Sequence, residues 1–171
     1  TDTNPHKGWA MTRLGVIALQ SGEYAKARSY FLPVVNGRVS ARPLERIKAM
    51  RRVAWTYHIE GDRLTAYRAY RELERFTGSE LVRAIARVEC AGLLMEFARC
   101  GKGSLADCRR ECQKVLASTP TRFKKQRATA ELMYMESYYF EQDYEQCIEL
   151  SEDFFRSYSD CIREYSAGLC M

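Results

Sequence analysis

The chain has 171 residues, of which 46% are hydrophobic and 29% charged, a balance typical of one folded domain or one array of small repeats. Four prolines, ten glycines and no low-complexity run argue against a disordered chain. No apolar run approaches the roughly 18 residues that a transmembrane helix needs, so we expect no membrane span.

The net charge of +5 conceals an uneven distribution along the chain. Residues 131–171 contain ten acidic residues against only Arg156 and Arg163, whereas residues 1–130 contain 25 basic and 12 acidic residues. Such a division favours an acidic partner for the basic part, or head-to-tail contacts between copies of the chain. A solvated surface without a partner is the alternative interpretation.

The predicted elements are all helical, because apolar residues recur at helical spacing and no useful stretch alternates as a strand would. After a polar segment at 1–7, we expect a single domain over 1–171 that consists of helix pairs and one last helix. In chain order these elements cover residues 8–37, 44–78, 79–120 and 121–158, followed by a final helix at 160–171.

Each predicted helix pair has its turn at a short sequence motif that recurs along the chain. The turns are expected at Gly22, Gly61, Gly101–Gly103 and Gln142. A small residue follows each turn by five positions, and an apolar residue follows it by twelve: Ala27, Ala66, Cys108 and Cys147, then Val34, Leu73, Val115 and Phe154. Four copies in register indicate an internal repeat, with the small residues buried where the two helices of a pair cross.

This pattern resembles the tetratricopeptide (TPR) signature. Leu14-Gly15 and Ala18 precede the first turn by eight, seven and four residues, and Pro120 stands where that family places a repeat-ending proline. The resemblance implies a right-handed α-solenoid of about four helix pairs, with a C-terminal helix and one concave groove.

The turns are 39, 42 and 39 residues apart, compared with about 34 in the usual repeat. This longer spacing resembles the bacterial envelope TPR arrays of the Tol–Pal coordinator and barrel-assembly lipoprotein type. The segment 155–160 is similar to the joint between repeats in those arrays, with Ser159 in place of their proline.

The TPR resemblance also implies which residues line the groove, since they come from the first helix of each pair. The candidates are Lys48, Arg51, Trp55 and His58 in the second copy, Trp9 in the first and Tyr139 in the fourth. Lys48 and Arg51 suit an acidic segment or a C-terminal carboxylate, with Trp55 as the apolar anchor. The alternatives are packing between repeats for Trp55 and a solvated face for the two cations.

The seven cysteines are an odd number and include no C-x-x-C motif, which favours reduced thiols and a reducing compartment such as the cytoplasm. The envelope resemblance favours the periplasm instead. Cys108 and Cys112 are four residues apart, as two metal ligands on one helix would be. However, only His6 and His58 are available as further ligands, and neither has the spacing for zinc. We therefore expect no metal and no cofactor.

We expect a non-enzymatic scaffold, alone or as part of a larger protein, that binds a peptide or a partner segment in its groove. No nucleophile–base set, phosphate loop or metal motif can be nominated, so neither catalysis nor a small-molecule substrate is expected.

The second hypothesis is a helical repeat associated with nucleic acid through the basic residues 38–127. The basic residues there lack the regularly interleaved aromatics that base stacking needs, which disfavours it. The third hypothesis is an enzyme or redox sensor.

Overall fold

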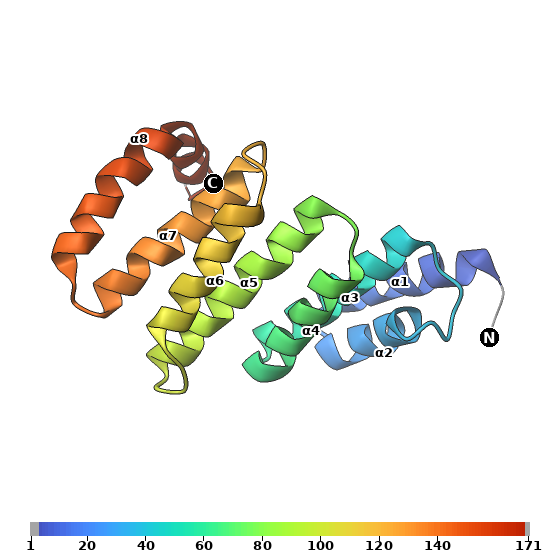
Figure 1. Cartoon of the computed structure of the whole chain (residues 1–171). Helices are drawn as coiled ribbons and strands as arrows, with labels where there is room; N and C mark the ends of the chain where they lie inside the picture. Colours follow the sequence, from blue (N-terminus) through green and yellow to red (C-terminus); the bar gives the residue numbers. More distant parts are fainter. Residues whose placement is uncertain (1–3, 170–171) are drawn as a thin grey trace. The chain divides into compact units, whose positions relative to one another are not determined.

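The computed structural model describes residues 4–169, and the side chains in that range apart from those of Pro5 and 159–169. The described residues contain eight helices and no strand, which confirms the all-α class. They separate into two compact units, of which unit 1 ends at Gly78 and unit 2 begins at Ser79. None of the described helices combines the length and apolar character required to cross a membrane. Figure 1 shows the helices coloured along the sequence.

Unit 1 consists of α1 (Pro5–Gln20), α2 (Tyr24–Val35), α3 (Pro43–Ile59) and α4 (Arg63–Phe76). Each helix packs against the next, and α1 also contacts α3. Helix α4 begins where the Asp62 side chain accepts a hydrogen bond from the backbone N–H of Thr65, an N-cap that satisfies a donor with no partner inside the helix.

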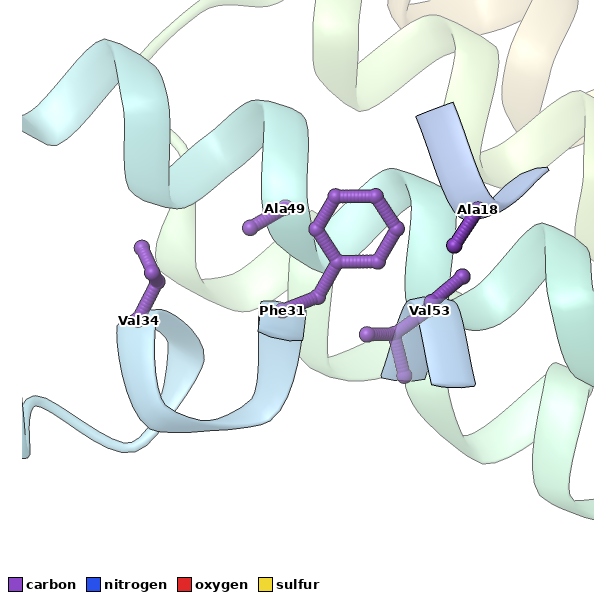
Figure 2. Close-up of a cluster of buried hydrophobic side chains, with 6 residues drawn as sticks. Ala18, Phe31, Val34, Ala49 and Val53 are labelled. Atoms are coloured by element: carbon purple, nitrogen blue, oxygen red, sulfur yellow. The ribbon is translucent and has the colours of Figure 1, made fainter. Parts of the chain in front are cut away.

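The core of unit 1 is a cluster of six buried residues from its first three helices, which are Ala18, Ala27, Phe31, Val34, Ala49 and Val53. Figure 2 shows the Phe31 ring between Ala49 on one side and Ala18 and Val53 on the other. Small residues surround the one large ring, so α1 and α3 can both approach α2 closely.

Unit 2 consists of α5 (Glu80–Arg99), α6 (Leu105–Ser118), α7 (Lys124–Phe140) and α8 (Tyr144–Leu169). Its core cluster contains Ala91, Met95, Cys108, Cys112, Val115 and Ala130. Four of these core positions, counted from the turns, match core positions of unit 1: Cys108, Cys112, Val115 and Ala130 correspond to Ala27, Phe31, Val34 and Ala49. The helix packing is therefore repeat-like.

The turns lie where the recurring sequence motif predicts them. Gly22, Gly61 and Gly101 have positive φ angles of 73°, 82° and 70°, a conformation that glycine adopts without steric cost. Gln142 takes the same role with φ 65° and is the one non-glycine residue with positive φ in the part of the chain that the structure describes. Three of the four small residues after the turns are fully buried, whereas Cys147 is only half-buried, because α8 is covered on one side.

A kink marks the predicted boundary between the fourth pair and the final helix. Tyr158 has non-helical angles (φ −126°, ψ 23°), and it divides α8 into a segment that ends the fourth pair and a segment that continues beyond it. Of the final helix expected at 160–171, residues 170–171 and the side chains of the rest lie outside the described part. The Tyr158 hydroxyl donates a hydrogen bond of 2.8 Å to Glu131 Oε1 of α7, and burial with this bond raises the pKa of Tyr158 to about 12.

Both units repeat one set of polar contacts between neighbouring helix pairs, which we call the inter-pair contact. In unit 1, Arg28 of α2 pairs with Glu60, and its guanidinium lies 4.6 Å from the Tyr57 ring centroid. In unit 2, Arg109 of α6 pairs with Glu141 through two hydrogen bonds of 2.8 and 2.9 Å and lies 4.6 Å from the Tyr138 ring centroid. Arg28 stands six residues after Gly22 and Arg109 six residues after Gly103, and each glutamate stands one residue before the next turn.

A second arginine contact also recurs, at the C-terminal end of the second helix of a pair. Arg46 Nε donates to the carbonyl of Val35 at 2.8 Å, and Arg127 Nη1 donates to the carbonyls of Leu116 and Thr119 at 2.6 and 2.9 Å. These carbonyls have no partner within their own helix, so the arginine of the following helix satisfies them.

Candidate functional site

The exposed side of α3 carries three of the six residues that the sequence nominates for binding. The opposite side of α3 is buried and contains Ala49, Met50, Val53, Ala54 and Thr56. Five exposed residues recur at spacings of four, three, four and four, and so share one side of the helix: Leu44, Lys48, Arg51, Trp55 and Ile59. We call these five residues the α3 face.

The two cations of the α3 face differ in their surroundings. Lys48 Nζ lies 3.0 Å from Glu45 Oε1 one turn earlier, and the lysine is exposed whereas the glutamate side chain is mostly covered. Arg51 is exposed, and its charge adds to burial in lowering the pKa of the neighbouring Arg52, with burial the larger cause. The α3 face therefore presents positive charge that an internal carboxylate offsets only at Lys48.

Trp55 combines packing with exposure. Its ring meets that of Tyr24, at the start of α2, edge to face at 6.1 Å between centroids and 78° between planes. The side chain is nevertheless 40% exposed. The contact restricts the indole to one orientation, and the exposed part of the ring stays available for an apolar contact.

Trp9 lies in an open pocket of about 430 Å³ that His6, Trp9, Arg42 and Glu45 line. The guanidinium of Arg13 lies 5.4 Å from the Trp9 ring centroid on α1. The pocket adjoins the α3 face because Glu45 lines it and also pairs with Lys48. The sequence indicated Trp9 but not Arg42 or Glu45, although Pro43 between them is a typical first residue of a helix.

The remaining nominated residues are His58, on the same helix, and Tyr139, in unit 2. His58 is half-buried in the last turn of α3, beside the α3 face. Tyr139 belongs to α7 in unit 2, where its exposed ring contacts those of Phe140 and Tyr144 at 5.7 and 5.8 Å between centroids. The structure thus brings Lys48, Arg51, Trp55 and His58 onto one helix. The binding role of all the nominated residues stays a prediction.

Leu44 and Ile59 are the functional candidates that the sequence analysis missed. Both are exposed apolar residues, and they extend the α3 face at its two ends. Their signal was the continued spacing of three and four residues beyond Lys48 and Trp55, which apolar residues in a predicted helix normally assign to the core.

The cysteines whose side chains the structure describes are free thiols. Cys90, Cys108 and Cys112 are buried, while Cys100 is exposed; the side chains of Cys161 and Cys170 lie outside the described part. The Cys108 thiol donates to the carbonyl of Ala91 at 3.3 Å. Its hydrogen bond with Cys112, together with burial, raises the pKa of the Cys112 thiol, which keeps that group protonated. Within the described residues no third histidine, cysteine or carboxylate joins this pair to form a metal site.

Comparisons with known proteins add no relative to these observations. No protein-family model matches the chain, and no curated protein sequence is significantly similar to it.

Proposed function

We propose that this protein is a TPR-like α-solenoid scaffold that binds an acidic segment of a protein partner on the α3 face. The observation that carries the proposal is the arrangement of that face. Lys48, Arg51 and Trp55 are exposed on one side of α3, between the exposed apolar residues Leu44 and Ile59. An apolar surface with cations at its centre matches a partner that alternates apolar and acidic residues.

The TPR-like assignment is supported by the recurrence of contacts rather than by composition. The inter-pair contact and the arginine at the preceding helix end occur at the same distances from the turn in both units. A repeat of this kind places the first helix of each pair on one side of its unit, and α3 is such a helix.

Each residue of the α3 face has a distinct part in the proposed binding. Trp55 supplies apolar contact area, and its packing on Tyr24 reduces the rotational freedom that binding would otherwise remove. Arg51 offers a planar guanidinium for two hydrogen bonds to one carboxylate. At Lys48 a partner carboxylate competes with Glu45, so this residue favours strongly acidic segments over neutral ones.

The test uses labelled peptide pools of defined composition. One pool contains random mixtures of Asp, Glu, Leu and Phe, and the matched pool replaces the acids with Lys and Arg. We expect fluorescence anisotropy to show binding of the acidic pool only, weakening as salt rises, because exposed charges are screened within about 8 Å at physiological ionic strength. The double reversal Lys48→Glu/Arg51→Glu should remove the salt-dependent binding.

The matched control is Lys102→Glu/Lys124→Glu, which reverses two exposed lysines outside the α3 face. This variant should bind the acidic pool as the parent does, while Trp55→Ala should weaken binding with its salt dependence retained. Equal loss in the control and in the α3 variant would refute a localised site. Salt-dependent binding of random RNA that exceeds binding of the acidic pool would favour a nucleic-acid partner instead.

A further inference from the structure

Helix α8 leaves one apolar side uncovered. Tyr144, Ile148 and Phe155 are 53%, 62% and 58% exposed. Spacings of four and seven residues place all three on the same side of the helix, and we call them the α8 face. Three large apolar side chains exposed together mark an interaction surface rather than an ordinary solvated helix.

The border of the α8 face is acidic. Glu145, Glu149 and Glu152 are exposed, and their helical spacing sets them along one edge of it. The one basic residue between Tyr144 and Tyr158 is Arg156, whose guanidinium lies 3.2 Å from the Asp153 carboxylate. A partner for the α8 face should therefore combine apolar residues with positive charge.

Helix α1 has the complementary character. Leu14 and Ile17 are 45% and 58% exposed, and with exposed Ala10 they form an apolar strip, which we call the α1 face. The helix contains Lys7 and Arg13 and no acidic residue. By helical spacing these two cations stand on opposite borders of the strip.

We propose that the α1 face of one copy of this chain docks on the α8 face of a second copy. The apolar residues of each face remove those of the other from water, and Lys7 and Arg13 approach the glutamates that border α8. The two faces are different, so the interface is heterologous, and a pair of copies leaves one α1 face and one α8 face unused for further copies. The interface uses none of the α3 face, so it stands independently of the function proposed above.

Two single substitutions each disrupt one of the two faces. Ile17→Glu places an acid in the α1 face opposite the glutamates of α8, and Ile148→Lys places a cation in the α8 face opposite the cations of α1. Both positions are exposed, so both variants should keep the helical circular dichroism of the parent. In sedimentation equilibrium at low salt, the parent should rise in mass with concentration above the 19.8 kDa of one chain. Each variant should associate at least about tenfold more weakly.

The decisive measurement is an equimolar mixture of the two variants. Ile17→Glu retains an intact α8 face and Ile148→Lys an intact α1 face, so the mixture should form a complex of two chains that neither variant forms alone. As a matched control, Leu64→Glu changes an equally exposed leucine of α4 and should associate like the parent.

Three results would overturn the proposal. The first is a parent that stays monomeric at every concentration. The second is a mixture that forms no complex although both variants are folded. The third is self-association that Ile148→Lys abolishes and Ile17→Glu leaves intact, which would indicate a symmetric contact between two α8 faces.

Discussion

Gly15 shows how much of unit 1 depends on the absence of a side chain. It is buried on α1, and a Cβ atom added there would lie 2.8 Å or less from three carbon atoms of the Phe31 ring. The ring is fully buried among the core residues. Close approach of α1 to α2 therefore requires glycine at this position.

Gly15→Ala should destabilise the protein by about 1–3 kcal/mol through overpacking against Phe31, although alanine has the higher helix propensity. Urea denaturation followed by circular dichroism measures the change. Gly78→Ala is the control, because a Cβ there meets nothing within 4 Å and the φ angle is not positive. If both variants unfold at the same urea concentration, the packing of Gly15 on Phe31 is not as described.

At the residue scale, the sequence could predict the buried small residues after the turns but not the buried side of α1. Ala27, Ala66 and Cys108 repeat in register, and that register alone assigns them to helix crossings. The buried side of α1 consists largely of Gly8, Thr12, Gly15 and Ala18, whereas its large apolar residues, such as Trp9 and Ile17, are exposed. Hydrophobic periodicity detects large residues, so it could not identify a core side built from small ones.

At the scale of helices, the inter-pair contact is the polar feature that joins the second helix of one pair to the first helix of the next. The Arg109 guanidinium donates to both carboxylate oxygens of Glu141, and this bond is the main cause that raises the pKa of Arg109. Nη1 also lies 3.3 Å from Ser137 Oγ, and the ring of Tyr138 covers the guanidinium plane. Because the planar guanidinium has this many defined partners, the inter-pair contact should stabilise the fold more than an ordinary surface ion pair does.

A double-mutant cycle with Arg109→Ala and Glu141→Ala should return a coupling free energy of roughly 0.5–1 kcal/mol, measured by urea denaturation. The matched control pair is Arg110 and Asp107, which are 3.0 Å apart on the same helix but lie in water. That cycle should return a coupling close to zero. Equal coupling energies in the two cycles would show that the inter-pair contact adds nothing beyond a surface ion pair.

The sequence predicted the helices well because each turn carries its own local signal. Glycines at Gly22, Gly61 and Gly101 stop a helix by adopting positive φ, a property of the residue itself. The sequence could also have revealed the inter-pair contact, because Arg28 and Arg109 occupy equivalent positions in two copies of the repeat. The kink of α8 at Tyr158 lies where the joint-like segment 155–160 indicated the end of the fourth pair, although neither glycine nor proline stands there. The TPR resemblance nominated Lys48, Arg51 and Trp55 of the α3 face, but it did not indicate the exposed apolar residues at its two ends, since exposure depends on what packs against a helix.

At the scale of the molecule, the described contacts are grouped within two units. The two core clusters, both inter-pair contacts and both arginine contacts at helix ends lie entirely before Gly78 or entirely after Ser79. Each unit therefore has its own apolar core and its own polar contacts between pairs, which are the properties of a part that can fold by itself.

We therefore expect fragments 1–78 and 79–171 to fold separately. Each should show helical circular dichroism and a cooperative thermal transition, because cutting the chain between Gly78 and Ser79 divides neither core cluster. A single small core supplies only about 3–5 kcal/mol, so both transitions should occur at moderate temperature.

Phe31→Ala should abolish the transition of fragment 1–78, since it empties the centre of that core, at a cost of about 3–5 kcal/mol. In the whole chain, the same substitution should leave the transition of residues 79–171 in place. If it instead unfolds the whole chain in one step, or if fragment 79–171 shows no helical signal alone, the two units depend on each other for stability.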